Sequence, residues 1–136
     1  MKNPDCLFCD FENPDRNTLI TQNDLAYARW DNIPVSDGHA EVAPKRHVES
    51  FFDLDDDEVA AMYTLAKVAR GIIVSKYKPD AFTIGINDGA AAGRTIHHLH
   101  LHLIPRYVGD VENPRGGIRH IIPGKGDYRV DERRAV

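Results

Sequence analysis

The stretch GRTIHHLHLHLIPR, residues 93–106, decides the fold prediction because polar and apolar side chains alternate along it. The alternating residues are His98, Leu99, His100, Leu101, His102 and Leu103. Side chains of a β-strand point alternately to its two faces. We therefore predict a strand over residues 95–106, with three imidazoles on one face and three leucines facing the core. The fourth histidine, His97, is expected to point with the leucines or to lie at the strand's edge.

The spacing of the three histidines limits what they can do together. Alternate residues of a strand are about 6.6 Å apart at Cα, so three of them span about 13 Å. Two such imidazoles can converge on one zinc ion, whereas three from a straight strand reach one ion with difficulty. Imidazole can also act as a base, an acid or a nucleophile near neutral pH. The pattern thus favours separate roles over a single three-histidine metal site.

Four further strands are expected upstream of the histidine stretch. Residues 18–30, TLITQNDLAYARW, read as two short strands around a polar turn, and residues 38–44, GHAEVAP, have β character. Residues 81–88, AFTIGIND, are rich in aromatic and β-branched side chains. The small-residue turn at residues 89–93, GAAAG, predicts that this last strand pairs antiparallel with the histidine strand.

One long helix is predicted over residues 55–77. Its acidic first turn, residues 55–58, suits the free amides and positive dipole end of a helix better than a metal site. Helical spacing places five apolar residues on one face: Val59, Met62, Ala66, Ala69 and Ile73. Strands, one long helix and then strands predict the α+β class, with a mainly antiparallel five-stranded sheet packed against the helix.

Composition bounds the class of protein. The 136 residues suit one compact domain, with 42% hydrophobic and 28% charged residues. A net charge of −4 argues against general nucleic-acid binding, and no apolar run reaches membrane-spanning length. The acidic, proline-broken N-terminus does not resemble a signal peptide. We therefore expect a cytoplasmic protein with reduced cysteines.

The charge is uneven along the chain. Residues 115–136 contain six Arg and Lys residues against three Asp and Glu residues, a net charge of +3. This segment is either a solvated tail or an arm that meets a polyphosphate or a partner subunit.

The motif CLFC, Cys6 to Cys9, is ambiguous by itself. A CxxC pair serves either redox chemistry or half of a zinc site, and it can also be an empty reduced pair. Redox pairs usually open a helix in a thioredoxin-like unit, and that context is missing here. A zinc site would need two histidines, because the chain has only two cysteines.

Two segments carry a resemblance to a known family. NDGAAAGRTIHHLHLHLIPR (87–106) resembles the signature of the histidine triad (HIT) superfamily, and RWDNIPVSDGHAEVAPKRHVE (29–49) resembles the upstream strand of that family. The resemblance covers roughly residues 6–108 and extends to zinc-containing bacterial members of the Hint and Fhit type. It implies the HIT-like fold and a homodimer whose two sheets join. We thus expect a HIT domain at residues 1–108 and a basic extension at 109–136.

The resemblance implies a reaction at the α-phosphate of a nucleotide conjugate. The middle histidine of the family's triad is the nucleophile, here His100, which would form a nucleotidyl-histidine that water then cleaves. His102 and His39 match histidines that line the phosphate and donate hydrogen bonds to its oxygens.

Further residues match the family's substrate-binding positions. Asp31 matches the residue that binds ribose, although a loop aspartate can also simply cap a turn. Asn87, Gly93 and Thr95 match positions beside the phosphate. Arg94 stands where many members have glutamine, and it could face a polyphosphate leaving group or point to solvent.

The resemblance also implies a structural zinc site. Zinc-bearing members with the N-terminal CxxC motif complete the site with two histidines. Carried over, the four ligands are Cys6, Cys9, His47 and His98. This assignment agrees with the spacing argument, because His98 would serve the metal while His100 and His102 face the phosphate.

Three functions stay open at this stage. The first is a hydrolase that releases AMP from an adenosine conjugate, such as a dinucleoside polyphosphate or a nucleoside phosphoramidate. The second is a nucleotidyl transferase or phosphorylase with the same covalent intermediate. The third is a non-catalytic, zinc-bound module that binds nucleotides.

Overall fold

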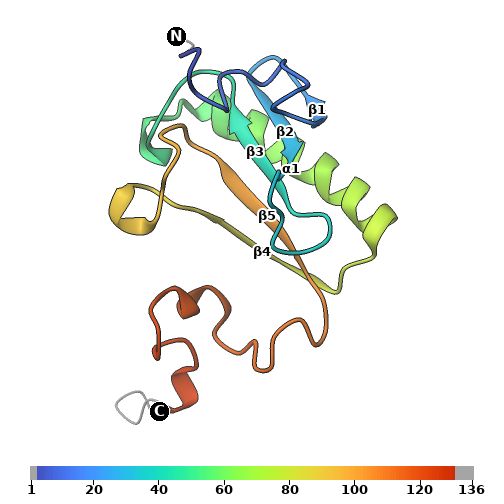
Figure 1. The fold of residues 1–136 in the computed structure, drawn as a ribbon, viewed down its shortest axis with the longest axis vertical. Coiled ribbons are helices and arrows are strands. Elements are labelled where there is room, and N and C mark those ends of the chain that lie inside the picture. The colour runs from blue at the N-terminus through green and yellow to red at the C-terminus, as the bar shows by residue number, and fades with distance from the viewer. Residues whose placement is uncertain (1–2, 131–136) are drawn as a thin grey trace.

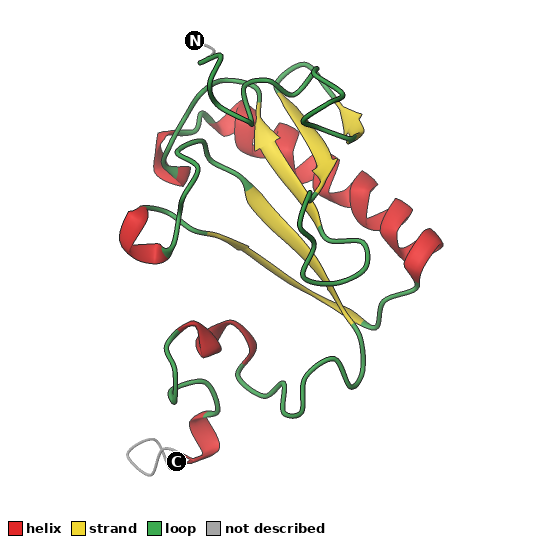
Figure 2. Cartoon of the chain, viewed as in Figure 1, coloured by secondary structure: helices red, strands yellow, loops and turns green. Residues whose placement is uncertain are grey.

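A five-stranded antiparallel sheet with one long helix on one face forms the body of the protein (Figures 1 and 2). The computed structural model describes residues 3–130. The strand order is β1-β2-β3-β5-β4. The strands are β1 (Leu19–Gln22), β2 (Ala26–Trp30), β3 (Ala40–Pro44), β4 (Ala81–Ile86) and β5 (Leu101–Arg106), and the helix is α1 (Asp56–Tyr77). The predicted α+β class, five strands and antiparallel pairing of the last two strands are confirmed.

The sheet buries side chains on both faces. Small and aliphatic residues of the strands, such as Ala28, Val42 and Leu103, pack with residues of α1 in the main core. The intervening residues of the same strands point the other way. Tyr27 and Ala43 form a second core there with Phe8 and Phe11 of the N-terminal segment. The histidine face of the sheet is therefore bounded by the N-terminal segment, while α1 covers the opposite face.

The buried face of α1 differs from the predicted apolar face at residues 58, 59 and 65. Met62, Ala69 and Ile73 are buried as expected, and Ala66 is half-buried against the core. Val59, which was predicted on the same face, is 38% exposed, whereas Leu65, which was not among the predicted residues, lies in the core. The helical period of 3.6 residues explains why residue 65 is buried and residue 59 is not. The line of buried side chains along the helix, through residues 62, 69 and 73, passes through residues 65 and 58 rather than through residue 59.

The predicted strand over residues 95–106 is too long at its start. β5 includes only Leu101–Arg106, so His98 and His100 precede the strand and only His102 lies in it. Residues before 101 turn toward the loop after β3, where the Leu99 amide donates to the Val48 carbonyl at 2.6 Å. Leu99 and Leu103 nevertheless reach the main core. A hydrogen bond to the segment after β3 thus replaces the strand-to-strand hydrogen bonds expected for residue 99. The leucines still lie on the predicted side of the sheet, toward the core.

The segment after β5 consists of turns and two short 3₁₀ helices, Gly117–Ile121 and Tyr128–Val130 (Figure 2). The expected division into residues 1–108 and 109–136 stays a prediction, and residues 131–136 of the basic extension lie outside the described part of the chain. Among the helices that the structure describes, none is long and apolar enough to cross a membrane.

The start of α1 provides a stability prediction. Glu58 is buried and accepts hydrogen bonds from the Asp55 amide at 2.9 Å and from Arg46 at 2.6 Å. These partners, Arg46 first, hold the pKa of Glu58 below its ordinary value. Because Arg46 is partly exposed, we expect Glu58→Gln to lower the free energy of unfolding by only about 1 kcal/mol.

The predicted effect of Glu58 depends on pH. A carboxyl whose pKa is lowered by folding stabilises the protein above its unfolded pKa of about 4.3, and this stability is lost as pH falls through the lower folded value. Urea denaturation at pH 7 and pH 3 measures the difference, with exposed Asp57→Asn as the matched control. An equal effect of Glu58→Gln at both pH values would contradict the prediction.

Candidate functional site

Two histidines from neighbouring strands meet on the sheet face opposite α1. His39 immediately precedes β3 and His102 lies in β5, and His39 Nε2 is 2.9 Å from His102 Nδ1. The Val35 amide donates to His39 Nδ1 at 3.2 Å, so the proton of His39 is on Nε2 and points to His102. His102 then accepts at Nδ1 and carries its own proton on Nε2. This chain of hydrogen bonds leaves His102 with one N–H donor to offer to a ligand.

His100 is fixed as a neutral imidazole. Its Nδ1 donates to the backbone carbonyl of His98 at 2.8 Å, which leaves the lone pair on Nε2. The ring stacks on Phe8, with centroids 4.4 Å apart and planes 12° apart. Burial lowers the pKa of His100, and burial likewise lowers the pKa values of His39 and His102. At neutral pH the ring therefore offers an unprotonated nitrogen in a fixed orientation, as a nucleophile requires.

Asp31 lies at the edge of this group, just after β2. Its Oδ2 is 3.5 Å from His39 Nε2, and its Oδ1 accepts a hydrogen bond from the Ile33 amide at 2.7 Å. Asp31 therefore caps its own turn and also faces His39. The structure thus brings together four of the predicted site residues: Asp31, His39, His100 and His102.

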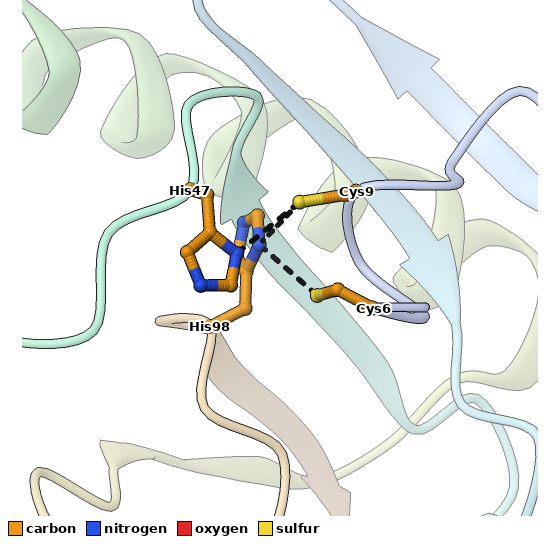
Figure 3. A group of neighbouring side chains, drawn as sticks. All are labelled: Cys6, Cys9, His47 and His98. Carbon is orange, nitrogen blue, oxygen red and sulfur yellow. Dashed lines mark hydrogen bonds between the residues drawn. The ribbon is translucent and has the colours of Figure 1, made fainter. Parts of the chain in front are cut away.

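Cys6, Cys9, His47 and His98 form a second cluster (Figure 3). One candidate ligand atom from each lies within 4.8 Å of all the others. Cys9 Sγ is 3.2 Å from His47 Nδ1 and 3.5 Å from His98 Nδ1, and Cys6 Sγ is 3.5 Å from the same His98 nitrogen. Bonds of about 2.3 Å to sulfur and 2.0–2.1 Å to nitrogen, in a tetrahedron, give ligand separations of this size.

The protonation of His98 also suits a metal. Its Nε2 donates to the Pro44 carbonyl at 2.8 Å, so the lone pair is on Nδ1, which faces both sulfurs. Burial lowers the pKa of His98 to about 4. Two cysteines, which bind the metal as thiolates, and two histidines are the donor set of a closed zinc site, so the residues present fit that metal.

The loop between β4 and β5 carries the other predicted site residues. Asn87 and Thr95 are exposed, and Gly93 has a φ of 97°, which ends a short 3₁₀ turn and favours glycine. Arg94 donates to the Glu49 carbonyl at 2.9 Å and its side chain is only 10% exposed. Within residues 3–130, no hydrogen bond or ion pair joins these four to the histidine group.

Arg94 also settles the position of His97. Arg94 Nε donates to His97 Nδ1 at 3.1 Å, and His97 is exposed rather than packed with the leucines. Arg94 is thus directed at the Glu49 segment rather than at solvent. Of the two positions expected for His97, the one beside the leucines is wrong, because the chain before Leu101 does not continue the strand.

Sequence reasoning missed two charged residues beside the histidines. Glu41 is buried in β3, with its Oε2 3.9 Å from His100 Nε2 and 3.8 Å from His102 Nδ1. Arg29 of β2 is buried against it, with Nη1 2.5 Å from Glu41 Oε1. A signal was available, because Glu41 follows His39 by two residues and Arg29 precedes Asp31 by two. The alternation that placed the histidines on one face places these charges there as well.

Comparison with known proteins gives the chain's relatives. The model of the HIT domain family matches residues 12–109. An uncharacterized HIT-like protein of Mycoplasma pneumoniae is 33% identical over 108 residues, which cover 79% of this chain and 75% of that protein. The bis(5′-adenosyl)-triphosphatase of Dictyostelium discoideum is 36% identical over 72% of this chain and 66% of its own length. An AP-4-A phosphorylase of Mycobacterium tuberculosis is 34% identical over 68% of this chain and 48% of its own.

Solved structures agree with the sequence relatives. A histidine triad nucleotide-binding protein of Sulfolobus tokodaii has a TM-score of 0.71 at 33% identity, covering 76% of this chain and 70% of that one. A zinc-bound histidine triad family protein of Mycobacterium smegmatis has a TM-score of 0.68 at 34% identity, covering 78% of each chain. The fold, the grouped histidines and the match over residues 12–109 together show that this chain belongs to the HIT domain family.

Proposed function

We propose that the protein is a nucleotide hydrolase that acts at the α-phosphate of an adenosine nucleotide conjugate and releases AMP. The observation that carries the proposal is the neutral, oriented imidazole of His100, with its Nε2 lone pair beside the donor chain of His39 and His102. The Dictyostelium discoideum relative, a bis(5′-adenosyl)-triphosphatase, supports a dinucleoside polyphosphate as the substrate class. A nucleoside phosphoramidate presents the same α-phosphate and is included in the proposal.

The proposed reaction has two displacements. In the first, the lone pair of His100 Nε2 forms a bond to phosphorus, and the bond from phosphorus to the leaving group breaks with its electron pair. The Nδ1 proton stays in the hydrogen bond to the His98 carbonyl, so the ring becomes an imidazolium. In the second, water bonds to phosphorus and the electron pair of the N–P bond returns to Nε2. The attacking water loses a proton to solvent in this second step. A phosphate leaving group departs as an anion in the first step, and an amine leaving group takes up its proton from solvent there.

The other proposed site residues bind the substrate. His102, oriented by His39, donates from Nε2 to a phosphate oxygen whose charge grows in the transition state. The Asp31 carboxylate accepts hydrogen bonds from the ribose hydroxyls. Asn87, Thr95 and the backbone at Gly93 contact the phosphates after the β4–β5 loop moves toward His100. Arg94 would meet a polyphosphate leaving group in the same movement, at the cost of its bonds to Glu49.

Zinc is proposed as a structural ion held by Cys6, Cys9, His47 and His98. The separations of their ligand atoms and the zinc-bound relative from Mycobacterium smegmatis support this site. When bound, the ion would link the N-terminal segment to the turn after β3 and to the chain before β5. It takes no part in the two displacements.

The protein is also proposed to be a homodimer with joined sheets. β4 is an edge strand of the sheet, and its Ile84 is 53% exposed. A strand that leaves its outer hydrogen-bonding groups and an apolar side chain uncovered is suited to pair with a second copy.

A phosphorylase or transferase is the second candidate function. The relative from Mycobacterium tuberculosis, an AP-4-A phosphorylase, favours this function. Both functions share the covalent intermediate and differ in the acceptor that completes the cycle. A non-catalytic nucleotide-binding module is the third candidate, and it would form no intermediate.

A substrate panel tests the proposed function. We expect AMP to be released from adenosine 5′-phosphoramidate or from diadenosine polyphosphates, and an adenylylated protein to be seen by intact mass after rapid quenching without acid. Nucleotide sugars complete the panel. Formation of ADP in place of AMP when inorganic phosphate is added would show a phosphorylase instead. Nucleotide binding without product or adduct would identify the non-catalytic module.

A further inference from the structure

A row of three charged or ionisable side chains crosses the sheet beneath the proposed phosphate site. Arg29 of β2 is the register partner of Glu41 of β3, and Glu41 is the register partner of His102 of β5. Register partners on antiparallel strands direct their side chains to the same face, where they contact one another. The row therefore lies on the face that carries His39, His100 and His102.

Glu41 is held so that its two oxygens have different surroundings. Oε1 accepts a hydrogen bond from Arg29 Nη1, and Arg29 is itself fixed by a bond to the Arg16 carbonyl at 3.2 Å and by the Phe8 ring. Oε2 lies 3.9 Å from His100 Nε2 and 3.8 Å from His102 Nδ1. Both distances exceed hydrogen-bond length, so Glu41 influences the histidines through its charge and does not occupy the nitrogen that must attack.

The proposed reaction places a positive charge where Glu41 can stabilise it. The neutral ring of His100 becomes an imidazolium once Nε2 has bonded to phosphorus, because the Nδ1 proton is retained. A carboxylate about 4 Å away in a buried site favours this charge much more strongly than it would in water. Arg29 balances the carboxylate, so the pair is neutral overall and does not repel an incoming phosphate.

We propose that Glu41 is a positioning residue of the reaction, an inference that rests on the proposed function. Its carboxylate, held by Arg29, stabilises the positive charge that His100 acquires when His100 Nε2 bonds to phosphorus. Glu41 touches neither the phosphate nor the leaving group, and it acts only through His100. The buried ion pair beside the triad thereby has a function in the chemistry and is more than a packing feature.

The titration of Glu41 gives the proposal a signature. Burial first, and then the charge of Asp31, raise the pKa of Glu41 to about 7, against the opposing charge of Arg29. The other ionisable groups facing it are His100, His102 and Tyr27, which are neutral at pH 7, since burial lowers the pKa values of the histidines and raises that of Tyr27. Because the carboxylate is the active form, the rate of adduct formation should rise as pH increases through about 7.

The test compares Glu41→Gln with wild type in single-turnover adduct formation on the best substrate of the panel. We expect the rate of adduct formation to fall about 10- to 100-fold, with KM changed little, because a developing charge loses its counter-charge while the ground-state contacts remain. The rise near pH 7 should disappear, so that the rate of adduct formation by Glu41→Gln no longer changes through that range. Exposed Glu112→Gln makes the same chemical change elsewhere and should match wild type.

A second variant is needed in case Glu41→Gln does not fold. Removal of one partner of a buried ion pair leaves the charge of the other partner uncompensated. Arg29→Met with Glu41→Leu removes both charges together and should show the same rate loss and the same missing rise. Adduct formation at the wild-type rate in either folded variant would overturn the inference. His100→Ala separates the two claims. If it forms no adduct while Glu41→Gln is normal, only the inference fails; if it forms the adduct, the proposed function falls and the inference with it.

Discussion

Replacing His100 by alanine is expected to lower turnover by a factor on the order of 10⁴ or more and to abolish the adenylylated protein. Losses of that size follow when an enzyme loses its attacking group, because the remaining contacts can still bind the substrate but cannot divide the displacement into two steps. Binding of AMP should persist, since Asp31, His39 and His102 are unchanged. Steady-state turnover, intact mass and AMP titration together measure the three expectations.

The same stretch of sequence supplies a matched control for His100. His97 is three residues away, is exposed and bonds only to Arg94 among the contacts that the structure describes, so His97→Ala should keep nearly full turnover. His100→Gly offers a further check, because imidazole added to solution can enter the space of the missing ring and restore part of the activity. Wild-type turnover in His100→Ala would remove the proposed mechanism altogether.

Strict alternation of side chains was enough to predict much of this site. It placed the imidazoles opposite the leucines, and Leu99 and Leu103 do reach the main core. Alternation could not show where the strand begins, because that depends on a bond from the Leu99 amide to Val48, which is distant in sequence. The predicted strand therefore included His98 and His100, which the structure places before β5.

The register between strands explains why the role of Glu41 was not predicted. Glu41 looked like one polar residue in an apolar strand, and nothing local indicated that Arg29 and His102 would be its neighbours on either side. That knowledge requires the order of the strands and their register. The cysteine–histidine cluster was predictable only through resemblance to a family, since its members come from three separate segments of the chain.

Removal of zinc is expected to destabilise the protein by about 4 kcal/mol when free zinc had been present at about 1,000 times its Kd. A metal that binds only the folded chain adds its binding free energy to folding. Cys9 contacts both His47 and His98, so Cys9→Ser should reproduce the effect and reduce zinc to well under one ion per chain. Elemental analysis and denaturation with and without a chelator measure both quantities, and His97→Ala is the control with an intact cluster.

Loss of zinc should also slow adduct formation, because one hydrogen bond connects the cluster to His100. The side chain of His98 belongs to the cluster, and its carbonyl accepts the hydrogen bond that fixes the His100 ring and keeps the Nε2 lone pair free. When the cluster is opened, the backbone at His98 is held less tightly and His100 can turn or change its tautomer. We therefore expect Cys9→Ser to slow adduct formation even at temperatures where the chain stays folded. Full-rate adduct formation in a folded, zinc-free protein would show that the Phe8 stack and the leucines alone hold His100 in place.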